Sequence, residues 1–424
     1  MTYTEALDYL KLASERGSKL GLERVEALMG LLGDPQEKVK VIHVSGTNGK
    51  GSFGAMLTSV LCSAGYKTGG FSSPAITAVT DSYRIGCKEI TEQRFADIIT
   101  KAAPLCESMD DKPTEFEVLA AAAYLLFAEE KCDIAVVECG MGGDTDATNV
   151  MTAPMLSVIT NVQSDHCGFL GSTIAEIASH KAGIIKQGRP AYFGGDSEEA
   201  LNVIKARAAE MSAPLTLKDL SHISDVRYSL DGISLTWKGL PLNTPLCGSY
   251  QLDNIVNVLT CVDILRDIGF DISDDALKKG LAEAKWHGRF EILRREPYVI
   301  FDGAHNPDGI RFAADTISRF FTEKAAILIG VMADKEYGLY ADMLGRYIDK
   351  AFTVRPDNPR ALHSSKLAEV FTAKGIKAES FEVLSDGVEA AYSYAKEKDI
   401  PLIALGSLYM YREFTVCLDR ISQK

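Results

Sequence analysis

The run Val41–Ser52, VIHVSGTNGKGS, holds the residues whose types and spacing point most directly to chemistry. A β-branched segment leads into a turn that carries three glycines, one lysine and one serine. Glycine accepts positive φ and lets backbone N–H groups come close to phosphate oxygens. Three positions are expected to do so: Gly46, Gly49 and Gly51. Lys50 would then reach the outer phosphates of a polyphosphate, and Ser52 would lie near its magnesium ion.

The turn is expected to open a helix from Ser52 to about Ala64, with Gly65 as its stop, so that the positive end of the helix dipole faces the anion. The spacing differs from the general nucleotide-loop pattern, which places four residues between the first glycine and Gly-Lys. Here two residues intervene, and Gly51 follows the lysine. From this pattern alone, a nucleotide site and a tight strand-to-helix connection both remain open.

Two further polar positions follow apolar strand-like runs, where open parallel sheets place ligand-binding groups. Glu138 opens the glycine-rich segment Cys139–Asn149, and Asp165-His166 lies beyond the run Met155–Asn161. A carboxylate at such a position suits Mg²⁺. The alternatives are a solvated strand-end acid for Glu138 and a hydrogen-bonded loop histidine for His166. The glycine cluster after Glu138 favours the metal-binding interpretation.

The elements that would hold these residues alternate between strands and helices through about residue 285. Continuous β-branched runs separated by helices predict a parallel sheet covered on both faces. Capping-box pairs, Thr114 with Glu117 and Thr173 with Glu176, open two of the helices. The predicted strands are Val39–Ser45, Cys132–Glu138 and Met155–Asn161.

The alternation of strands and helices is interrupted at Val226–Lys238. There, two short strand-like runs on either side of Asp231-Gly232 predict a β-hairpin with a type I′ turn. A helix over Gln251–Asp267 follows. Strand and helix patterns then alternate again after Trp286–Leu293. The predicted later strands lie within Tyr298–Asn306, Ala325–Met332, Lys350–Val354 and Ile400–Ser407.

The fold expected from these patterns is α/β. A P-loop-type parallel-sheet ATPase domain with a small β-hairpin region would span residues 1–285, and a smaller Rossmann-like α/β domain would span residues 286–424. A chain of 424 residues is too long for one ordinary core, which agrees with two domains.

Composition restricts the class of protein. With 46% hydrophobic and 24% charged residues the chain is expected to be soluble and globular. Net charge −13 argues against nucleic-acid binding. No apolar run reaches the ~18 residues of a membrane helix, and the N-terminus predicts an amphipathic helix capped by Thr2 and Glu5, not a signal peptide. Nine cysteines without a CxxC pair suggest a reducing, cytoplasmic location without a disulfide framework or zinc site.

The full string GTNGKGS resembles the loop of the folylpolyglutamate synthase and dihydrofolate synthase family, within the ATP-dependent Mur ligase superfamily. The resemblance begins upstream in Gly21–Pro35, GLERVEALMGLLGDP, and extends over nearly the whole chain. Further matching motifs are KAGI at 181–184, GSYQLDN at 248–254, HGRFE at 287–291, DGAHNP at 302–307 and LGSLY at 405–409.

The resemblance implies an ATP site in which Asn254 faces the adenine, Arg289 reaches the γ-phosphate and Asp302 holds the ribose. The nucleotide-binding residues that it implies are Gly46, Thr47, Asn48, Gly49, Lys50, Gly51, Ser52, Asn254, Arg289 and Asp302.

The resemblance also implies two magnesium ions. Ser73, in FSSP, would supply a hydroxyl ligand, and Glu138 and His166 would supply two more. In this family the lysine that matches Lys181 is carbamylated by CO₂, which converts a cation into a carboxylate able to bind the second ion. Without the resemblance, Lys181 would be interpreted as an ordinary surface lysine.

The implied reaction is ATP-dependent amide ligation through an acyl phosphate, with L-glutamate as the amine. The first substrate would be dihydropteroate, a reduced folate or both, and Asp146 would contact it. His305 and Ser407 are the candidates to bind glutamate. The implied catalytic residues are Lys50, Lys181, Arg289 and His305. A monomer that binds neither membrane nor nucleic acid is expected.

Three departures from the family pattern concern segments near the first substrate. Ala75-Ile76 replace His-Leu, Asp81-Ser82 replace an acid-Arg pair, and Asp144-Thr145 replace Arg-Leu. They leave open a relative that acts on a non-folate carboxylate. A P-loop NTPase is the other alternative, although it gives no reason for the DGAHNP and LGSLY motifs.

Overall fold

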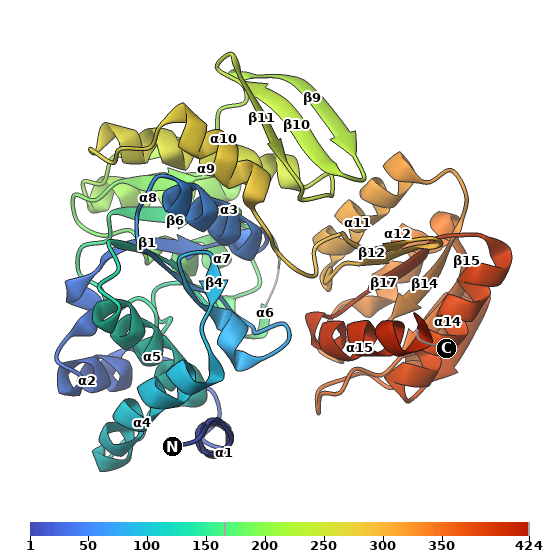
Figure 1. Cartoon of the computed structure of the whole chain (residues 1–424), viewed down its shortest axis with the longest axis horizontal. Helices are drawn as coiled ribbons and strands as arrows, with labels where there is room; N and C mark the ends of the chain where they lie inside the picture. The colour runs from blue at the N-terminus through green and yellow to red at the C-terminus, as the bar shows by residue number, and fades with distance from the viewer. Residues whose placement is uncertain (165–166, 423–424) are drawn as a thin grey trace. The chain divides into compact units, whose positions relative to one another are not determined.

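The computed structural model describes residues 1–164 and 167–422. Within them the chain forms two compact units, each with its own sheet (Figure 1). Across the described residues, no helix is both long and apolar enough to cross a bilayer. Unit 1 comprises Met1–Ser224, Leu235–Asn243 and Asp253–Ala284, and unit 2 comprises Asp225–Ser234, Thr244–Leu252 and Lys285–Lys424.

Unit 1 contains an eight-stranded sheet in the order β4-β3-β2-β5-β1-β6-β7-β8. The pairs from β2 through β8 are parallel, and β3 and β4 add an antiparallel edge. The continuous apolar runs of the central strands suit a sheet covered on both faces. The strands are β1 (Lys40–Ser45), β2 (Thr68–Phe71), β3 (Tyr83–Ile85), β4 (Lys88–Glu89), β5 (Ile134–Glu138), β6 (Leu156–Ile159), β7 (Ala191–Phe193) and β8 (Leu215–Leu217).

Helices cover both faces of this sheet; α3 and α10 lie together on one face, and α4 and α5 on the other (Figure 1). The α-helices of this part are α1 (Tyr3–Ser14), α2 (Glu23–Leu31), α3 (Lys50–Ser63), α4 (Glu92–Ser108), α5 (Glu115–Glu129), α6 (Cys167–Leu170), α7 (Ile174–Ala182), α8 (Glu198–Glu210), α9 (Gln251–Asp267) and α10 (Asp274–Glu283). Two 3₁₀ turns, η1 (Pro35–Lys38) and η2 (Val79–Ser82), join them.

The predicted capping boxes are confirmed at the starts of α1, α5 and α7. In each, a threonine side chain accepts from the glutamate N–H three residues on, and that glutamate accepts from the threonine N–H. The helix after the glycine turn begins two residues earlier than predicted, at Lys50, because Gly49 takes φ 86° and serves as its N-cap.

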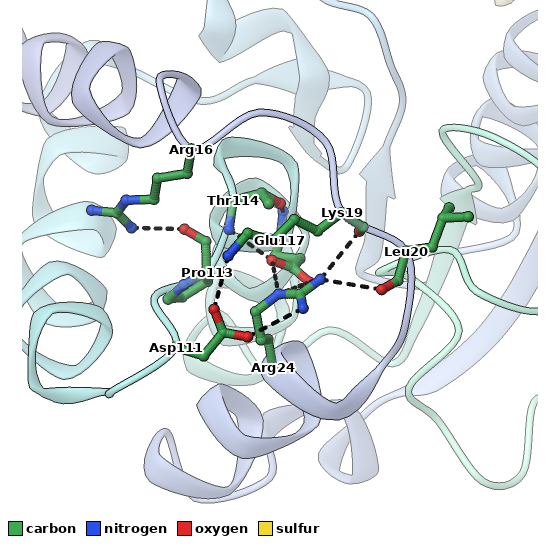
Figure 2. A network of polar contacts seen from close by, with 8 residues as sticks. All are labelled: Arg16, Lys19, Leu20, Arg24, Asp111, Pro113, Thr114 and Glu117. Atoms are coloured by element: carbon green, nitrogen blue, oxygen red, sulfur yellow. Dashed lines mark hydrogen bonds and ion pairs between the residues drawn. The ribbon is translucent and has the colours of Figure 1, made fainter. Parts of the chain in front are cut away.

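A polar network links the start of α2 and the segment before it to the start of α5 (Figure 2). The Arg24 Nε atom donates to both oxygens of Glu117, at 3.1 and 3.2 Å, and Arg24 Nη1 lies 3.3 Å from Asp111. Lys19 Nζ donates to the same aspartate at 2.8 Å. Glu117 is 3% exposed and also caps α5, so its carboxylate serves two elements. Arg24 belongs to the GLERV part of the motif that the sequence singled out.

The region predicted as one hairpin has three strands, in the order β11-β10-β9: β9 (Ile223–Ser229), β10 (Gly232–Trp237) and β11 (Leu240–Thr244). The predicted type I′ turn at Asp231-Gly232 is wrong, because Asp231 does not take positive φ. Both residues between β10 and β11, Lys238 and Gly239, do so, at 48° and 82°. The first turn is instead held by Ser229, whose hydroxyl accepts from Asp231 N–H and donates to Gly232 O.

Unit 2 contains a six-stranded sheet in the order β12-β13-β17-β14-β15-β16. β12 is antiparallel to β13, and the remaining pairs are parallel. Continuous apolar runs such as that of Ala325–Ile329 are fully buried, which is typical of such sheets. The strands are β12 (Glu291–Arg295), β13 (Tyr298–Phe301), β14 (Ala325–Ile329), β15 (Ile348–Val354), β16 (Ala378–Phe381) and β17 (Leu402–Leu405).

The helices of unit 2 follow its strands in alternation, as the sequence predicts. They are α11 (Pro307–Phe320), α12 (Tyr340–Leu344), α13 (Ser364–Ala373), α14 (Leu384–Lys398) and α15 (Tyr411–Ser422), with 3₁₀ turns η3 (Tyr337–Leu339), η4 (Gly345–Tyr347) and η5 (Leu408–Met410). Asn306 caps α11 by accepting from Gly309 N–H, and Pro307 occupies the first position, where no N–H is needed. The predicted mixed α/β architecture is confirmed.

Candidate active site

The glycine turn joins β1 to α3 at the carboxyl edge of the unit 1 sheet. Gly46 takes φ 148°, and a Cβ built there would lie 1.9 Å from Thr160 Oγ1. A Cβ on Gly49 would lie 2.2 Å from the side-chain oxygen of Asn254. Both positions therefore require glycine. Gly51 was expected to take positive φ as well, which is wrong, since it lies in the first turn of α3 in helical conformation.

Residues beyond β6 hold this turn in place. Thr47 N–H and Asn48 N–H both donate to Asn161 Oδ1, at 3.2 and 2.9 Å. Thr47 and Asn48 also bond through their side chains to Gln163. These two backbone N–H groups are thus directed at the protein in this structure. The N–H groups at the start of α3 have no carbonyl partner within the helix and suit an anion.

Asn161 and Gln163 were missed in the sequence analysis. Their only signal was their position directly after a parallel strand, which is shared by many residues without such a role.

Lys50 lies at the first position of α3 and folds back over the turn. Its Nζ donates to Gly46 O at 2.9 Å and to Thr47 O at 3.3 Å, and it lies 4.0 Å from Glu138 Oε1. Glu138 reaches this place because β5 pairs in parallel with β1, with Val44 opposite Glu138. The structure therefore brings together a lysine and a carboxylate that the sequence separates by 88 residues. Ser52, two residues further along α3, is buried.

The segment after Glu138 folds around Asp146. The Asp146 carboxylate accepts from Met141 N–H at 2.8 Å, from Thr148 N–H at 3.0 Å and from the Thr148 hydroxyl at 2.5 Å. Burial raises the pKa of Asp146, and these donors oppose that rise. Asp146 was predicted to contact the first substrate. In this structure the Asp146 carboxylate accepts hydrogen bonds from Met141 and Thr148 of its own segment and so organises that segment.

A buried histidine supports the same segment from β1. His43 Nε2 lies 2.8 Å from Thr148 Oγ1 and 3.1 Å from Cys139 Sγ. Burial lowers the pKa of His43 to about 3, so the ring is neutral at physiological pH. This contact was not predicted, because His43 lies in the middle of a strand pattern with no local signal.

Lys181 lies on α7 and is 4% exposed, so it is not an ordinary surface lysine. The backbone carbonyls of His180 and Lys181 pack against Gly143, where a Cβ would come within 2.9 Å of both. The neighbouring His180 Nδ1 lies 2.9 Å from Asp144 Oδ2. Asp144, one of the departures from the family pattern, is therefore paired with a residue adjacent to Lys181.

Ser73 lies in the loop after β2 and is partly buried. The following turn is held by Asp81, another departure, whose carboxylate accepts from the N–H groups of Ile76, Thr77 and Ala78. Asp81 is 7% exposed, so it organises this loop from inside. The acid of the altered Asp81-Ser82 pair thus serves the loop backbone in this chain.

The described part of the chain contains no group of three or more His, Cys, Asp or Glu side chains able to hold a metal. The predicted ligand His166 lies outside the described residues. Glu138 offers the hard oxygen donor that Mg²⁺ prefers, and Mg²⁺ commonly uses one or two carboxylates together with phosphate oxygens and water. The buried carboxylate beside Lys50 fits an ion of this kind.

In unit 2, the two residues that were predicted to bind nucleotide are Arg289 and Asp302. They lie near the carboxyl end of β13, which pairs in parallel with β17. Asp302 follows β13, is 2% exposed, and accepts from Ala304 N–H at 2.9 Å and from Tyr250 OH at 3.0 Å. Burial raises the pKa of Asp302, while Arg289 and Tyr250 oppose that rise. A Cβ on Gly303 would lie 2.4 Å from Arg289 Nη1. Tyr250 was not predicted as a partner of Asp302.

The two residues that were predicted to bind glutamate lie on neighbouring loops at the same edge of the unit 2 sheet. His305 Nδ1 donates to Gly303 O at 2.8 Å, which fixes its tautomer because a carbonyl can only accept. Ser407 follows β17 and accepts from Tyr409 N–H at 3.2 Å. Gly406 N–H donates to Ala304 O at 2.9 Å and links the two loops. The structure thus brings Asp302, His305 and Ser407 to one edge of unit 2.

Comparison with known proteins identifies the family of this chain. Residues 44–262 match the Mur ligase middle domain, and residues 288–407 match the Mur ligase glutamate ligase domain. The chain is 34% identical over 420 residues to the dihydrofolate synthase/folylpolyglutamate synthase of Bacillus subtilis, with 96% of this chain and 97% of that protein covered. The chain belongs to the folylpolyglutamate synthase/dihydrofolate synthase family.

Other members of this family are also similar over nearly their whole length. The folylpolyglutamate synthase of Lacticaseibacillus casei is 32% identical over 424 residues, with 97% of each protein covered. A crystal structure of the Mycobacterium tuberculosis folylpolyglutamate synthase, complexed with ADP and AMPPCP, matches with a TM-score of 0.89 at 27% identity and covers 99% of both chains. A structure of Escherichia coli FolC in complex with DHPP and ADP matches with a TM-score of 0.85, also at 27% identity, over 98% of both chains.

The part of the chain that matches the Mur ligase glutamate ligase domain, residues 288–407, contains the DGAHNP motif and ends at Ser407 of the LGSLY motif. A P-loop NTPase that only hydrolyses nucleotide has no use for this domain, so that alternative is set aside.

Proposed function

We propose that this chain is an ATP-dependent amide ligase that joins L-glutamate to dihydropteroate, to the γ-carboxyl of a reduced folate, or to both, and releases ADP and phosphate. The observation that carries the proposal is the glycine turn with Lys50 beside Glu138, in a chain that aligns over nearly its whole length with enzymes of this name. The acceptor's carboxylate would attack the γ-phosphate to give an acyl phosphate, which the glutamate amine would then displace.

The unit 1 residues would bind the triphosphate. The start of α3 offers N–H groups and the positive end of its dipole, and Lys50 needs only to leave two carbonyls to reach a phosphate oxygen. In phosphoryl transfer, most of the acceleration comes from positioning and from charge stabilisation of this kind. Gly46 to Ser52 are therefore the proposed phosphate-binding residues, with Thr47 and Asn48 held in place by Asn161.

Ser73, Glu138 and His166 are the proposed ligands of a first magnesium ion, and carbamylated Lys181 that of a second. The burial of Lys181 supports the modification, since a carbamate at this buried position would attract a cation. When bound, magnesium would neutralise charge on the transferring phosphoryl group.

The unit 2 residues would complete the nucleotide and glutamate contacts. Asp302, whose burial raises its pKa against the opposing effects of Arg289 and Tyr250, is proposed to bind the ribose, and Arg289 the γ-phosphate. His305 and Ser407 are proposed to bind the incoming glutamate. In unit 1, Asn254 is proposed to face the adenine and Asp146 to order the wall beside the first substrate.

The choice of first substrate rests on relatives. Bacillus subtilis and Escherichia coli proteins are named for both reactions, while the Lacticaseibacillus casei protein is named for one.

We propose a monomeric enzyme of the cytoplasm with a ligase domain that begins near residue 286. The alternative is a ligase whose first substrate is a carboxylate other than a pterin or a folate.

The test is ADP release by the purified protein with ATP and Mg²⁺, with each of L-glutamate and the pterin omitted in turn. Ligation predicts ADP release that requires both, in a one-to-one ratio with product. With substrate labelled by ¹⁸O in its free carboxyl, one label should appear in the released phosphate, because the acyl phosphate transfers that oxygen. ADP release that needs neither substrate would contradict the proposal.

A further inference from the structure

Strand β1 buries two polar side chains on one face. Successive side chains of a strand alternate between its faces, so His43 and Ser45 lie on the same face, and both are fully buried. Both contact the glycine-rich segment that follows Glu138. Ser45 Oγ donates to Gly142 O at 2.5 Å, and His43 Nε2 lies 2.8 Å from Thr148 Oγ1. The strand that leads into the glycine turn therefore holds this segment at two points.

The hydrogen bonds at Thr148 have a fixed direction. Backbone N–H groups donate to both oxygens of Asp146, and the Thr148 hydroxyl lies 2.5 Å from its Oδ1 atom. The hydroxyl has one proton, which it donates to this carboxylate, so Thr148 Oγ1 accepts from His43. His43 therefore carries its proton on Nε2. Its Nδ1 atom, which is buried and has no hydrogen-bond partner within residues 1–164 and 167–422, is the nitrogen without a proton.

The same segment also packs against the end of α7. Asp144 N–H donates to His180 O at 2.9 Å, and Asn149 Nδ2 donates to Gly183 O at 3.3 Å. A Cβ on Gly183 would collide with Asp144, so the two backbones are in close contact. Lys181 lies in this last turn of α7. The segment thus connects the end of β5 to the helix turn that carries Lys181.

We propose that His43 is a positioning residue for the magnesium site, because it fixes the segment that sets the spacing between Glu138 and Lys181. This inference rests on the proposed function, in which these two side chains are ligands of the two ions. His43 acts through Thr148 and contacts no reacting atom. Removing a group that supports metal ligands from behind commonly changes metal affinity by about 10–100-fold.

The first test determines the His43 tautomer in the metal-free protein. In full-length protein labelled with ¹⁵N at histidine, long-range ¹H–¹⁵N correlations distinguish a proton on Nε2 from a proton on Nδ1. We expect the Nε2–H tautomer for His43, whose signals are assigned by their loss in His43→Gln. The Nδ1–H tautomer would overturn the proposal, since His43 could not then donate to Thr148.

The second test measures binding of AMPPCP, a non-hydrolysable ATP analogue, by calorimetry over a series of Mg²⁺ concentrations. His43→Leu and Thr148→Val should each raise the Mg²⁺ concentration needed for half-maximal binding about tenfold or more. His43→Gln keeps an N–H donor near the position of Nε2 and should remain close to the wild type. Because pterin and glutamate are absent, the result does not depend on the ligation reaction.

Thr353→Val is the matched control. Thr353 is a fully buried strand residue of unit 2 whose hydroxyl donates to Ser364 O at 2.8 Å. This variant should lose stability in urea unfolding, as Thr148→Val does, with an unchanged Mg²⁺ dependence. Both threonine variants keep the shape of the side chain, so Thr148→Val decides the matter if His43→Leu does not fold.

Two results would contradict the proposal in different ways. Reduced stability of His43→Leu and Thr148→Val with the wild-type Mg²⁺ dependence would show that His43 serves the fold alone. AMPPCP binding by the wild type that is independent of Mg²⁺ would contradict the metal site of the proposed function, and with it this role of His43.

Discussion

Lys50 is the residue on which the proposed phosphate chemistry depends most. Its ammonium is held by two turn carbonyls and lies near Glu138, so it is available to phosphate and contributes little to the core. We predict that Lys50→Ala lowers kcat about 10²-fold or more with an unchanged melting temperature, since one electrostatic contact to a transition state has this magnitude. Lys205→Ala, an exposed lysine on α8, is the control and should be fully active. Steady-state ADP release measures both, and near wild-type turnover in Lys50→Ala would exclude it from the phosphate site.

Asp302 gives a prediction about pH. Tyr250 OH donates to its carboxylate and opposes the burial that raises the Asp302 pKa. Tyr250→Phe removes that donor, so the carboxylate is less stable and protonates at higher pH. The acidic limb of kcat/KM should therefore move to higher pH, by about one unit for a lost hydrogen bond of ~1.4 kcal/mol. Tyr394→Phe removes a similar Tyr–Asp bond at an exposed position and should leave the profile unchanged. Coincident profiles for the wild type and Tyr250→Phe would show that Asp302 ionisation does not limit the reaction.

At the scale of elements, the glycine turn depends on a residue that follows a different strand. Asn161→Ala removes the side-chain oxygen that accepts from Thr47 and Asn48 N–H. Thr47 N–H keeps its bond to the Asn161 backbone oxygen, so the cost is about 1–3 kcal/mol for the Asn48 backbone donor. We predict a rise in KM for ATP of about tenfold for each 1.4 kcal/mol of that cost. Asn202→Ala, on the exposed face of α8, is the control. If ATP binding measured by calorimetry is the same in both variants, Asn161 does not position the turn.

The network of Figure 2 supplies a second prediction at this scale. Arg24 is the arginine partner of the buried Glu117, so Arg24→Ala leaves a buried carboxylate with its cation removed. We predict that the free energy of unfolding falls by about 3 kcal/mol or more. Arg311→Ala breaks an ion pair whose arginine is 61% exposed and should cost less than about 1 kcal/mol. Urea unfolding compares the two, and equal losses would show that Arg24 serves only as a surface charge.

Elements governed by neighbouring residues could be predicted from the sequence. The capping boxes at Thr2, Thr114 and Thr173 depend on residues three apart, and all three are present. The type I′ turn failed at Asp231-Gly232, because Ser229 supplies a competing local hydrogen bond. The positive φ at both central residues that such a turn requires occurs instead at Lys238-Gly239, whose sequence was not recognised as a turn signal.

For the whole molecule, the order of strands and helices was predictable because parallel sheets leave a clear alternation of patterns. Contacts between segments that are distant in the sequence could not be predicted. The pairing of Asn161 with the glycine turn and of Tyr250 with Asp302 depends on which segments become neighbours in the fold. Single residues at strand ends carry no signal of that choice, and the motifs gave candidate site residues without the residues that support them.

The central claim, that the molecule joins glutamate to a pterin acid, is tested most directly by its product. Purified full-length protein would be incubated with ATP, Mg²⁺ and L-glutamate, with dihydropteroate or with tetrahydrofolate, and the acceptor would be analysed by mass spectrometry. We predict that at least one acceptor gains the mass of one glutamyl residue, only when ATP and glutamate are both present. Unchanged dihydropteroate and tetrahydrofolate, while ATP is still converted to ADP, would contradict the claim.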